Sequence, residues 1–324
     1  MAISNIIKKP IKEEMSQFEP FFKEQLKSKI PLLGIITNYI LRRKGKQMRP
    51  MLVFLSAKLT GKSSESTYVA ATLIELLHTA TLIHDDVVDE TYQRRGVFSV
   101  NALWKSKIAV LVGDYFLSRG LSLALEKDQI GVLKAVSEAV TSMAEGELLQ
   151  IEKSRKLDIT EEVYYDIITK KTATLIAACT TAGALSVNAD QDKIDLLKQF
   201  GIYLGITFQI KDDLFDYEKT DLIGKPTGND IREKKMTLPL IYVLNTCDKK
   251  DKKHILATIR KHHKNDKKVA EVLDFVRKSG GIEYTFDKMI HYRDKALEVL
   301  NQFEDSEAKE AMIELVHYTT ERKK

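Results

Sequence analysis

The stretch TLIHDDVVDETYQRRG, residues 81–96, runs an apolar segment into a dense set of charges. The apolar positions upstream repeat at helical spacing and predict a helix from about residue 65 to residue 90. Three acidic residues at the end of this helix are followed by two basic ones: Asp85, Asp86, Asp89, Arg94 and Arg95. Because buried carboxylates are costly without compensating positive charge, the stretch is either a solvated surface or a cation-binding site.

The positions of the prolines predict the fold class. The six prolines stand at positions 10, 20, 31, 50, 226 and 239, so residues 51–225 contain none, and the whole chain has 15 glycines. A proline inside a helix costs about 3 kcal/mol, so a long proline-free interior is typical of helical proteins. Strand-like alternation of apolar and polar residues is scarce. We therefore predict an all-α protein with a single domain over residues 1–324.

The composition of the chain indicates the cellular compartment in which it works and the kinds of partner that it could bind. Two cysteines, Cys179 and Cys247, cannot form a disulfide framework, and the N-terminus lacks a signal-peptide pattern, so we expect a cytoplasmic protein. No apolar run reaches the roughly 18 residues of a membrane span, which predicts at most peripheral membrane contact. The basic excess gathers in residues 248–268 without aromatic residues or a recognition motif, so we read this segment as a solvated helix pair and expect no nucleic-acid binding.

A second acidic cluster supports a metal-binding role for the first one. Asp85 and Asp89 are one helical turn apart, and carboxylates at that spacing repel each other unless a cation such as Mg²⁺, which prefers oxygen ligands, bridges them. Alone, this spacing is weak evidence. The segment FQIKDDLFDYEK repeats it at Asp212, Asp213 and Asp216, again at the end of an apolar helix. Two such helices facing each other across a cavity would form a site for several magnesium ions.

Basic residues near the predicted helix ends could bind an anionic ligand beside these ions. The candidates are Lys46, Arg49, His78, Arg94, Arg95, Lys170, Lys171, Lys225 and Lys235. Each of them alone is more often a solvated residue, a helix-capping charge or a core histidine. Together with two carboxylate clusters they predict a diphosphate site, because Arg and Lys are the side chains that bind phosphate oxygens.

These motifs resemble those of the trans-isoprenyl diphosphate synthases, also called polyprenyl synthetases. The resemblance covers residues 41–281 and follows the family's order: GKQMRP, HTATLIHDDVVDETYQRRG, VGDYFLSRG, KKTATL, FQIKDDLFDYE, GKPTGNDIREKKMTLPLI and SGGIEYT. Two departures are small: Lys234 stands where the family usually has glycine, and the first acidic motif has a two-residue spacer. The resemblance implies a helical bundle of the isoprenoid synthase type around a central cavity, and a homodimer.

The resemblance also implies a role for individual residues. Asp85, Asp89 and Asp212 would be the main magnesium ligands, supported by Asp86, Asp213 and Asp216. The allylic diphosphate would be bound by Arg94, Lys171, Thr172, Gln209, Lys225 and Lys235, and isopentenyl diphosphate by Lys46, Arg49, His78 and Arg95. The residues expected to act in catalysis are Asp85, Asp89, Asp212, Arg94, Lys171 and Lys235. The allylic C–O bond would ionise, and the double bond of isopentenyl diphosphate would attack the resulting cation.

The residues before the first acidic cluster predict the length of the product. Ala80 and Thr81, one turn before Asp85, are small where short-chain members of the family carry a bulky aromatic. One turn of about 5.4 Å roughly matches one isoprene unit, so we predict an open passage and a product of about six to eight units, for a respiratory quinone side chain. Candidates for its lower wall are Leu77 and Leu121, with Leu76 and Leu125 as further possibilities that core packing explains equally well.

Other functions stay open from the residues alone. A metal-dependent phosphohydrolase would use His84 and Asp85 with His78, but that chemistry needs several imidazole ligands and the other five histidines lie at position 254 or beyond. A terpene cyclase would need a different second metal motif. A non-catalytic, diphosphate-binding subunit of a heteromeric synthase is disfavoured because both acidic clusters are intact.

Overall fold

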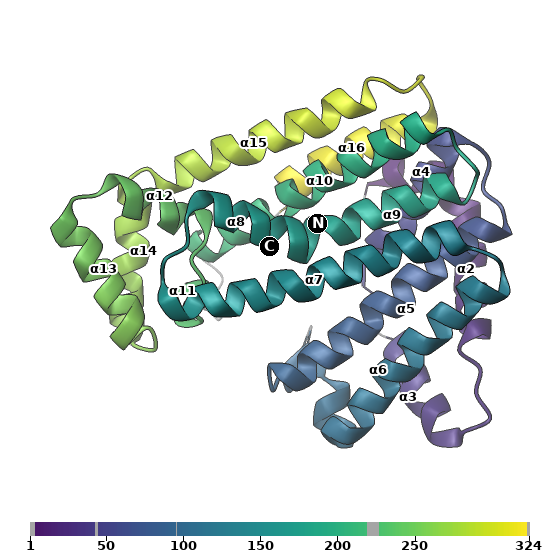
Figure 1. The fold of residues 1–324 in the computed structure, drawn as a ribbon, viewed down its shortest axis with the longest axis horizontal. Helices are drawn as coiled ribbons and strands as arrows, with labels where there is room; N and C mark the ends of the chain where they lie inside the picture. The colour runs from purple at the N-terminus through teal and green to yellow at the C-terminus, as the bar shows by residue number, and fades with distance from the viewer. Residues whose placement is uncertain (1–3, 43–44, 95, 219–226, 323–324) are drawn as a thin grey trace.

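The computed structural model describes residues 4–42, 45–94, 96–218 and 227–322, and these fold almost entirely into helices (Figure 1). The first half contains α1 (Asn5–Lys8), η1 (Lys9–Ile11, a 3₁₀ turn), α2 (Lys12–Gln25), α3 (Pro31–Leu41), α4 (Met48–Thr60), α5 (Glu65–Val88), α6 (Val100–Glu126) and α7 (Ile130–Lys156). The second half contains α8 (Glu161–Ile168), η2 (Thr169–Ala173, a π turn), α9 (Thr174–Leu185), α10 (Gln191–Tyr217), α11 (Asn229–Arg232), α12 (Leu238–Thr246), α13 (Lys249–His262), α14 (Asp266–Lys278), α15 (Gly281–Leu300) and α16 (Glu307–Glu321). The predicted all-α class is confirmed, with one short hairpin of β1 (Gln93–Arg94) and β2 (Val97–Phe98).

Helix α9 is the centre of the bundle. It packs against α4, α5, α7 and α10, and α10 packs in turn against α15, so that α7, α9, α10 and α15 run side by side in Figure 1. Two glycines of α10 make its approach close: a Cβ on Gly201 would lie 2.4 Å from Cα of Ala177, and one on Gly205 would lie 2.4 Å from Cα of Ala173. Any larger side chain would force α10 away from α9.

Local interactions define the two helices that carry the acidic clusters. A capping box opens α5: the Ser64 hydroxyl accepts from the backbone at Thr67, and the Thr67 hydroxyl accepts from the backbone N–H of Ser64. Helix α5 ends at Val88, with Asp89 as its C-cap, so the first acidic cluster lies at the C-terminal end of a helix, as predicted. The second cluster ends α10 in the same way.

Three local features shape the other helices. The N-terminal helical segment is interrupted at Pro10 by the 3₁₀ turn η1. Helix α4 begins two residues before Pro50, because proline is tolerated in the first turn, where its missing N–H is not needed. Helices α8 and α9 are joined by the π turn η2, which faces Gly146 of α7: a Cβ there would lie 2.8 Å from Cβ of Lys170.

Two helices, α5 and α6, are long and apolar enough to cross a membrane by length and composition. They pack against each other, and most of the apolar stretch of α5 is buried in the bundle. The stretch of α6 is only 39% buried, so one apolar face of α6 stays exposed in the protomer.

Candidate active site

The first acidic cluster is an exposed helix end with a fixed turn behind it. Asp85 and Asp89 are exposed, whereas Asp86 is buried. The backbone N–H of Asp89 donates to the Asp85 carbonyl at 2.8 Å, and the Asp86 carbonyl accepts from the backbone of Thr91 and the side chain of Asn101. The two exposed carboxylates therefore lie at the end of α5, a turn apart, on a backbone that the following loop holds in place.

The hairpin after this cluster carries the predicted arginines. Gln93 and Arg94 pair with Phe98 and Val97, and Gly96 has φ of +76°, a left-handed conformation that favours glycine. The side chain of Arg94 and the whole of Arg95 and Lys225 lie outside the part of the chain that the structure describes. Their roles in diphosphate binding stay predictions.

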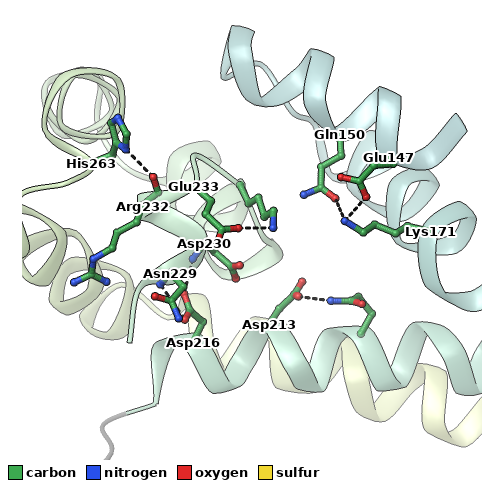
Figure 2. Close-up of polar contacts among 12 residues, drawn as sticks. Glu147, Gln150, Lys171, Asp213, Asp216, Asn229, Asp230, Arg232, Glu233 and His263 are labelled. Atoms are coloured by element: carbon green, nitrogen blue, oxygen red, sulfur yellow. Dashed lines mark hydrogen bonds and ion pairs between the residues drawn. The ribbon is translucent and has the colours of Figure 1, made fainter. Parts of the chain in front are cut away.

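The second acidic cluster is more deeply buried and is hydrogen bonded (Figure 2). The Asp213 carboxylate accepts from the Tyr164 hydroxyl at 2.7 Å and from the Gln209 amide at 2.8 Å. The Asp216 carboxylate accepts from the backbone N–H groups of Asn229 and Asp230, at 3.0 and 2.9 Å. Asp216 thus ties the start of α11 to the end of α10.

Asp230 is a member of this cluster that the sequence reasoning missed, although it stands in the quoted segment GKPTGND. Burial raises the pKa of Asp230 to about 8, with further raising by Asp213 and Asp216, while Lys235 opposes the shift. Burial likewise raises the pKa of Asp213 to about 7, against the lowering effect of its hydrogen bonds to Tyr164 and Gln209. Both carboxyl groups are therefore buried without enough compensation to keep their negative charge at its usual pKa, and the neighbouring carboxylates add to the effect of burial.

Two of the predicted lysines lie at the same site. Lys171, on the π turn, pairs with Glu147 at 2.5 Å and donates to Gln150 at 3.0 Å. Figure 2 shows Lys171, Asp213 and Asp230 pointing toward a common space from three different elements. Lys235 pairs with Glu233 beside this space. An anionic ligand that binds both ammonium groups would compete with Glu147 and Glu233 for them.

Thr172 and Gln209 join the π turn to α10. The Thr172 hydroxyl donates to the Gln209 side-chain oxygen at 2.8 Å, and the Gln209 amide donates to Asp213. This chain of hydrogen bonds fixes which end of the Gln209 amide faces the carboxylate. Gln209, which is predicted to bind the allylic diphosphate, is therefore in contact with a predicted magnesium ligand, and Thr172 is joined to that ligand through Gln209.

The C-terminal helix links the two predicted diphosphate sites. The Lys46 ammonium donates to the Tyr318 hydroxyl at 2.7 Å, and one turn later Arg322 donates to the Asp212 carboxylate at 2.6 Å. The Arg322 guanidinium also lies 4.1 Å from the ring centre of Phe208. Sequence reasoning missed Tyr318 and Arg322, which lie far from any acidic motif along the chain.

The remaining predicted residues occupy two helices near this link. Arg49 is half-buried in the first turn of α4, and His78 is half-buried on α5, where its carbonyl accepts from the Thr81 hydroxyl. Ala80 and Leu77 are buried in the core, whereas Thr81 and Leu121 are half-buried. Leu125 is 55% exposed, so it is no interior wall within one protomer.

The carboxylates of the two acidic clusters fit a divalent cation that takes its remaining ligands from water and substrate. Within the described ranges, no group of three or more His, Cys, Asp or Glu side chains is gathered so that it could hold a metal ion. Mg²⁺ usually takes one or two carboxylates and completes its shell with waters and substrate phosphates. The raised pKa values of Asp213 and Asp230, and the guanidinium on Asp212, show a site that attracts positive charge.

A pH-dependent gain in stability is expected from Asp230→Asn. The raised pKa means that folding at pH 8 buries a carboxylate that would be ionised in the unfolded chain, whereas near pH 4 this penalty disappears. Without added metal, the Asn variant should melt higher than the wild type by about 3 °C at pH 8, and the difference should shrink toward pH 5. Thermal unfolding in a chelator measures this, and a difference that does not change with pH would contradict it.

Comparisons with known proteins agree with the geometry. The family described as polyprenyl synthetase matches residues 30–276. Octaprenyl diphosphate synthase of Escherichia coli (strain K12) is 35% identical over 312 residues, covering 96% of each chain. The crystal structure of polyprenyl synthase from Caulobacter crescentus, complexed with calcium and isoprenyl diphosphate, is 31% identical with a TM-score of 0.89 over 99% of each chain. That of geranylgeranyl pyrophosphate synthase from Bacteroides thetaiotaomicron is 38% identical with a TM-score of 0.83 over 98% of each.

The resemblance read from the acidic motifs is thereby confirmed over nearly the whole chain. The phosphohydrolase reading has no support from the matched family, and the ring of its histidine, His84, lies 3.3 Å from Asp114 and packs against Gly113. The all-helical bundle, the two acidic helix ends and the matched family lead to one conclusion: the chain belongs to the polyprenyl synthetase family and is a trans-prenyltransferase that elongates an allylic diphosphate with isopentenyl diphosphate.

Proposed function

We propose that the chain is a Mg²⁺-dependent, long-chain polyprenyl diphosphate synthase of the cytoplasm. The observation that carries the proposal is the convergence of Asp213, Asp230 and Lys171 on one space (Figure 2). Lys46 is joined to this region through the C-terminal helix, since it bonds to Tyr318 while Arg322 binds Asp212. Buried carboxylates with raised pKa values next to ammonium groups form a site for a cation and a diphosphate together.

The chain's own residues would bind and orient the two substrates. Lys171 and Lys235 would leave their acidic partners to bind the allylic diphosphate, and they would stabilise the charge that develops on it as the C–O bond breaks. Lys46, with Arg49 and His78, would hold isopentenyl diphosphate. Mg²⁺ held by Asp85, Asp89 and Asp212 would supply further stabilisation of the leaving diphosphate. The proton lost after attack would pass to the released diphosphate, so no protein nucleophile is required.

We propose a product of about six to eight isoprene units, each roughly matched to one turn of α5, for a quinone side chain. The name of the Escherichia coli relative, octaprenyl diphosphate synthase, supports this length. The Bacteroides thetaiotaomicron relative is named for geranylgeranyl pyrophosphate, so similarity alone does not decide the length. The small side chains of Ala80 and Thr81 carry the proposal instead.

Incubation of the protein with Mg²⁺, labelled isopentenyl diphosphate and farnesyl diphosphate tests the function. We expect labelled polyprenyl diphosphates whose dephosphorylated alcohols have about six to eight units. A chelator should abolish their formation, and Mg²⁺ should restore it. Release of inorganic phosphate without condensation would overturn the proposal in favour of hydrolysis, and no turnover by the chain alone would favour a heteromeric synthase.

We further propose that the chain forms a homodimer through the exposed face of α6. Val110, Leu111 and Leu125 lie on the part of α6 that follows its break at Lys105, with Leu125 at 15 and 14 residues from the other two, and they are 39%, 55% and 55% exposed. A run of exposed apolar side chains on one helix is typical of an interface, because water contact with that area is unfavourable.

The Leu111→Lys variant is expected to weaken the dimer at least tenfold, since a buried ammonium without a partner is costly. Sedimentation velocity at several concentrations would measure the change. Phe286→Lys on α15, where Phe286 is 48% exposed, is the matched control and should leave the dimer intact. Equal weakening in both variants would contradict the assignment of the interface to α6.

A further inference from the structure

A stripe of basic residues follows one face of α13. It consists of Lys249, Lys252, Lys253, Arg260 and Lys261, which are exposed, with Leu256 and Ala257 between them. Their spacing of three, four and seven residues places them on the same side of the helix, where they line a shallow hollow of about 430 Å³. The opposite side of α13, with Ile255, Thr258 and Ile259, is buried. The basic stripe is therefore the outer surface of a well-packed helix.

The stripe's charge is not neutralised by the protein. None of its five cations makes an ion pair with a residue that the structure describes. The nearby acids serve other purposes: Asp248 caps α13 by accepting from the backbone of Asp251, and Asp266 pairs with Arg232. On the neighbouring helix, by contrast, Lys268 pairs with Glu271 and Arg277 with Asp274.

The charge of the whole chain is concentrated in this hairpin. Residues 248–268 contain nine Lys or Arg and three Asp, a formal charge of +6, while the whole chain has a net charge of +5. The other residues together are therefore close to neutral. Lys264 and Lys267, both exposed, extend the basic surface around the turn between α13 and α14.

The hairpin lies at one end of the molecule and is tied to the active site. Figure 1 shows α13 and α14 as the outermost helices at that end. His263 bonds to the Arg232 carbonyl at 2.6 Å, and Arg232 also pairs with Asp266. Arg232 belongs to α11, the helix that carries Asp230 (Figure 2). Any partner bound to α13 would therefore lie at the same end of the molecule as the residues proposed to bind diphosphate.

We propose that the basic stripe of α13 docks the enzyme on an anionic lipid bilayer. The stripe is long, exposed and lysine-rich, which suits a surface of many negative headgroups. It has no aromatic side chains on which bases could stack, as single-stranded nucleic acids require. The apolar side of α13 is buried, so docking is electrostatic and reversible, without insertion. Its benefit, release of a lipid product beside a membrane, rests on the proposed function, whereas the docking itself does not.

Sedimentation with lipid vesicles tests the proposal without substrates. The full-length protein is mixed with vesicles of phosphatidylcholine containing roughly 30 mol % phosphatidylglycerol, and with vesicles of phosphatidylcholine alone. We expect binding to the anionic vesicles only, with loss of binding at about 0.5 M salt. Each basic residue near such a surface contributes about a fivefold factor in partitioning, so K249Q/K252Q/K253Q should bind about 100-fold more weakly.

A matched variant controls for net charge. K12Q/K134Q/K198Q removes three lysines that are equally exposed and make no ion pair with described residues, but that are scattered over α2, α7 and α10. It should keep binding to within about threefold, and both variants should keep wild-type prenyl transfer with soluble substrates. Equal losses in the two variants, or no binding by the wild type, would overturn the proposal. Loss of affinity for a short RNA in the α13 variant, with vesicle binding unchanged, would assign the stripe to nucleic acid instead.

Discussion

The Asp212→Asn variant is expected to lose about 10³-fold in kcat, the effect typical of removing one electrostatic group that acts on the transition state. Asparagine keeps the size of the side chain but lacks the negative charge that would hold a divalent cation against the leaving diphosphate. Steady-state kinetics with isopentenyl diphosphate and an allylic diphosphate would measure the loss. Asp192→Asn, an exposed acid in the first turn of the same helix, is the control and should stay within about twofold of the wild type. Near-normal activity of Asp212→Asn would remove Asp212 from the site.

The contact between Arg322 and Asp212 allows a second test of whether this carboxylate binds a divalent cation. The Arg322 guanidinium neutralises Asp212, and a divalent cation bound to the same carboxylate in the absence of substrate would have to compete with it. We expect Arg322→Ala to bind Mg²⁺ about tenfold more tightly by calorimetry, whereas Arg322→Lys should stay closer to the wild type, because a charged hydrogen bond is worth about 1.5–3 kcal/mol. Unchanged Mg²⁺ affinity in Arg322→Ala would show that the cation does not use the Asp212 carboxylate.

The features predictable from sequence were those set by neighbouring residues. Proline and glycine positions predicted the helical class, and apolar spacing predicted that both acidic clusters end helices. The partners of the site residues were not predictable, because they come from distant segments: Tyr164 on Asp213 and Arg322 on Asp212 lie 49 and 110 residues away along the chain. The π turn that carries Lys171 was not predictable either, because the space for it is left by Gly146, which lies on another helix.

The two residues predicted to control product length, Ala80 and Thr81, differ in how deeply they are buried. Ala80 is 1% exposed and packs in the core, whereas Thr81 is half-buried and so has accessible surface. A phenylalanine at Ala80 would overpack the core, at a cost of about 1–3 kcal/mol, and its effect on chain length would be mixed with an effect on stability. Thr81 is therefore the better position for testing where the growing chain runs.

In the Thr81→Phe variant, the longest product should shorten to about three or four isoprene units, because the new ring would lie one turn, about 5.4 Å, below Asp85. The rate of the first condensation should change little, since no diphosphate-binding residue is altered. Chromatography of the dephosphorylated products would give the lengths. Leu82→Phe, at the next position and also half-buried, points to a different side of α5 and should leave the length unchanged. If both variants made the wild-type product, the growing chain would not pass this face of α5.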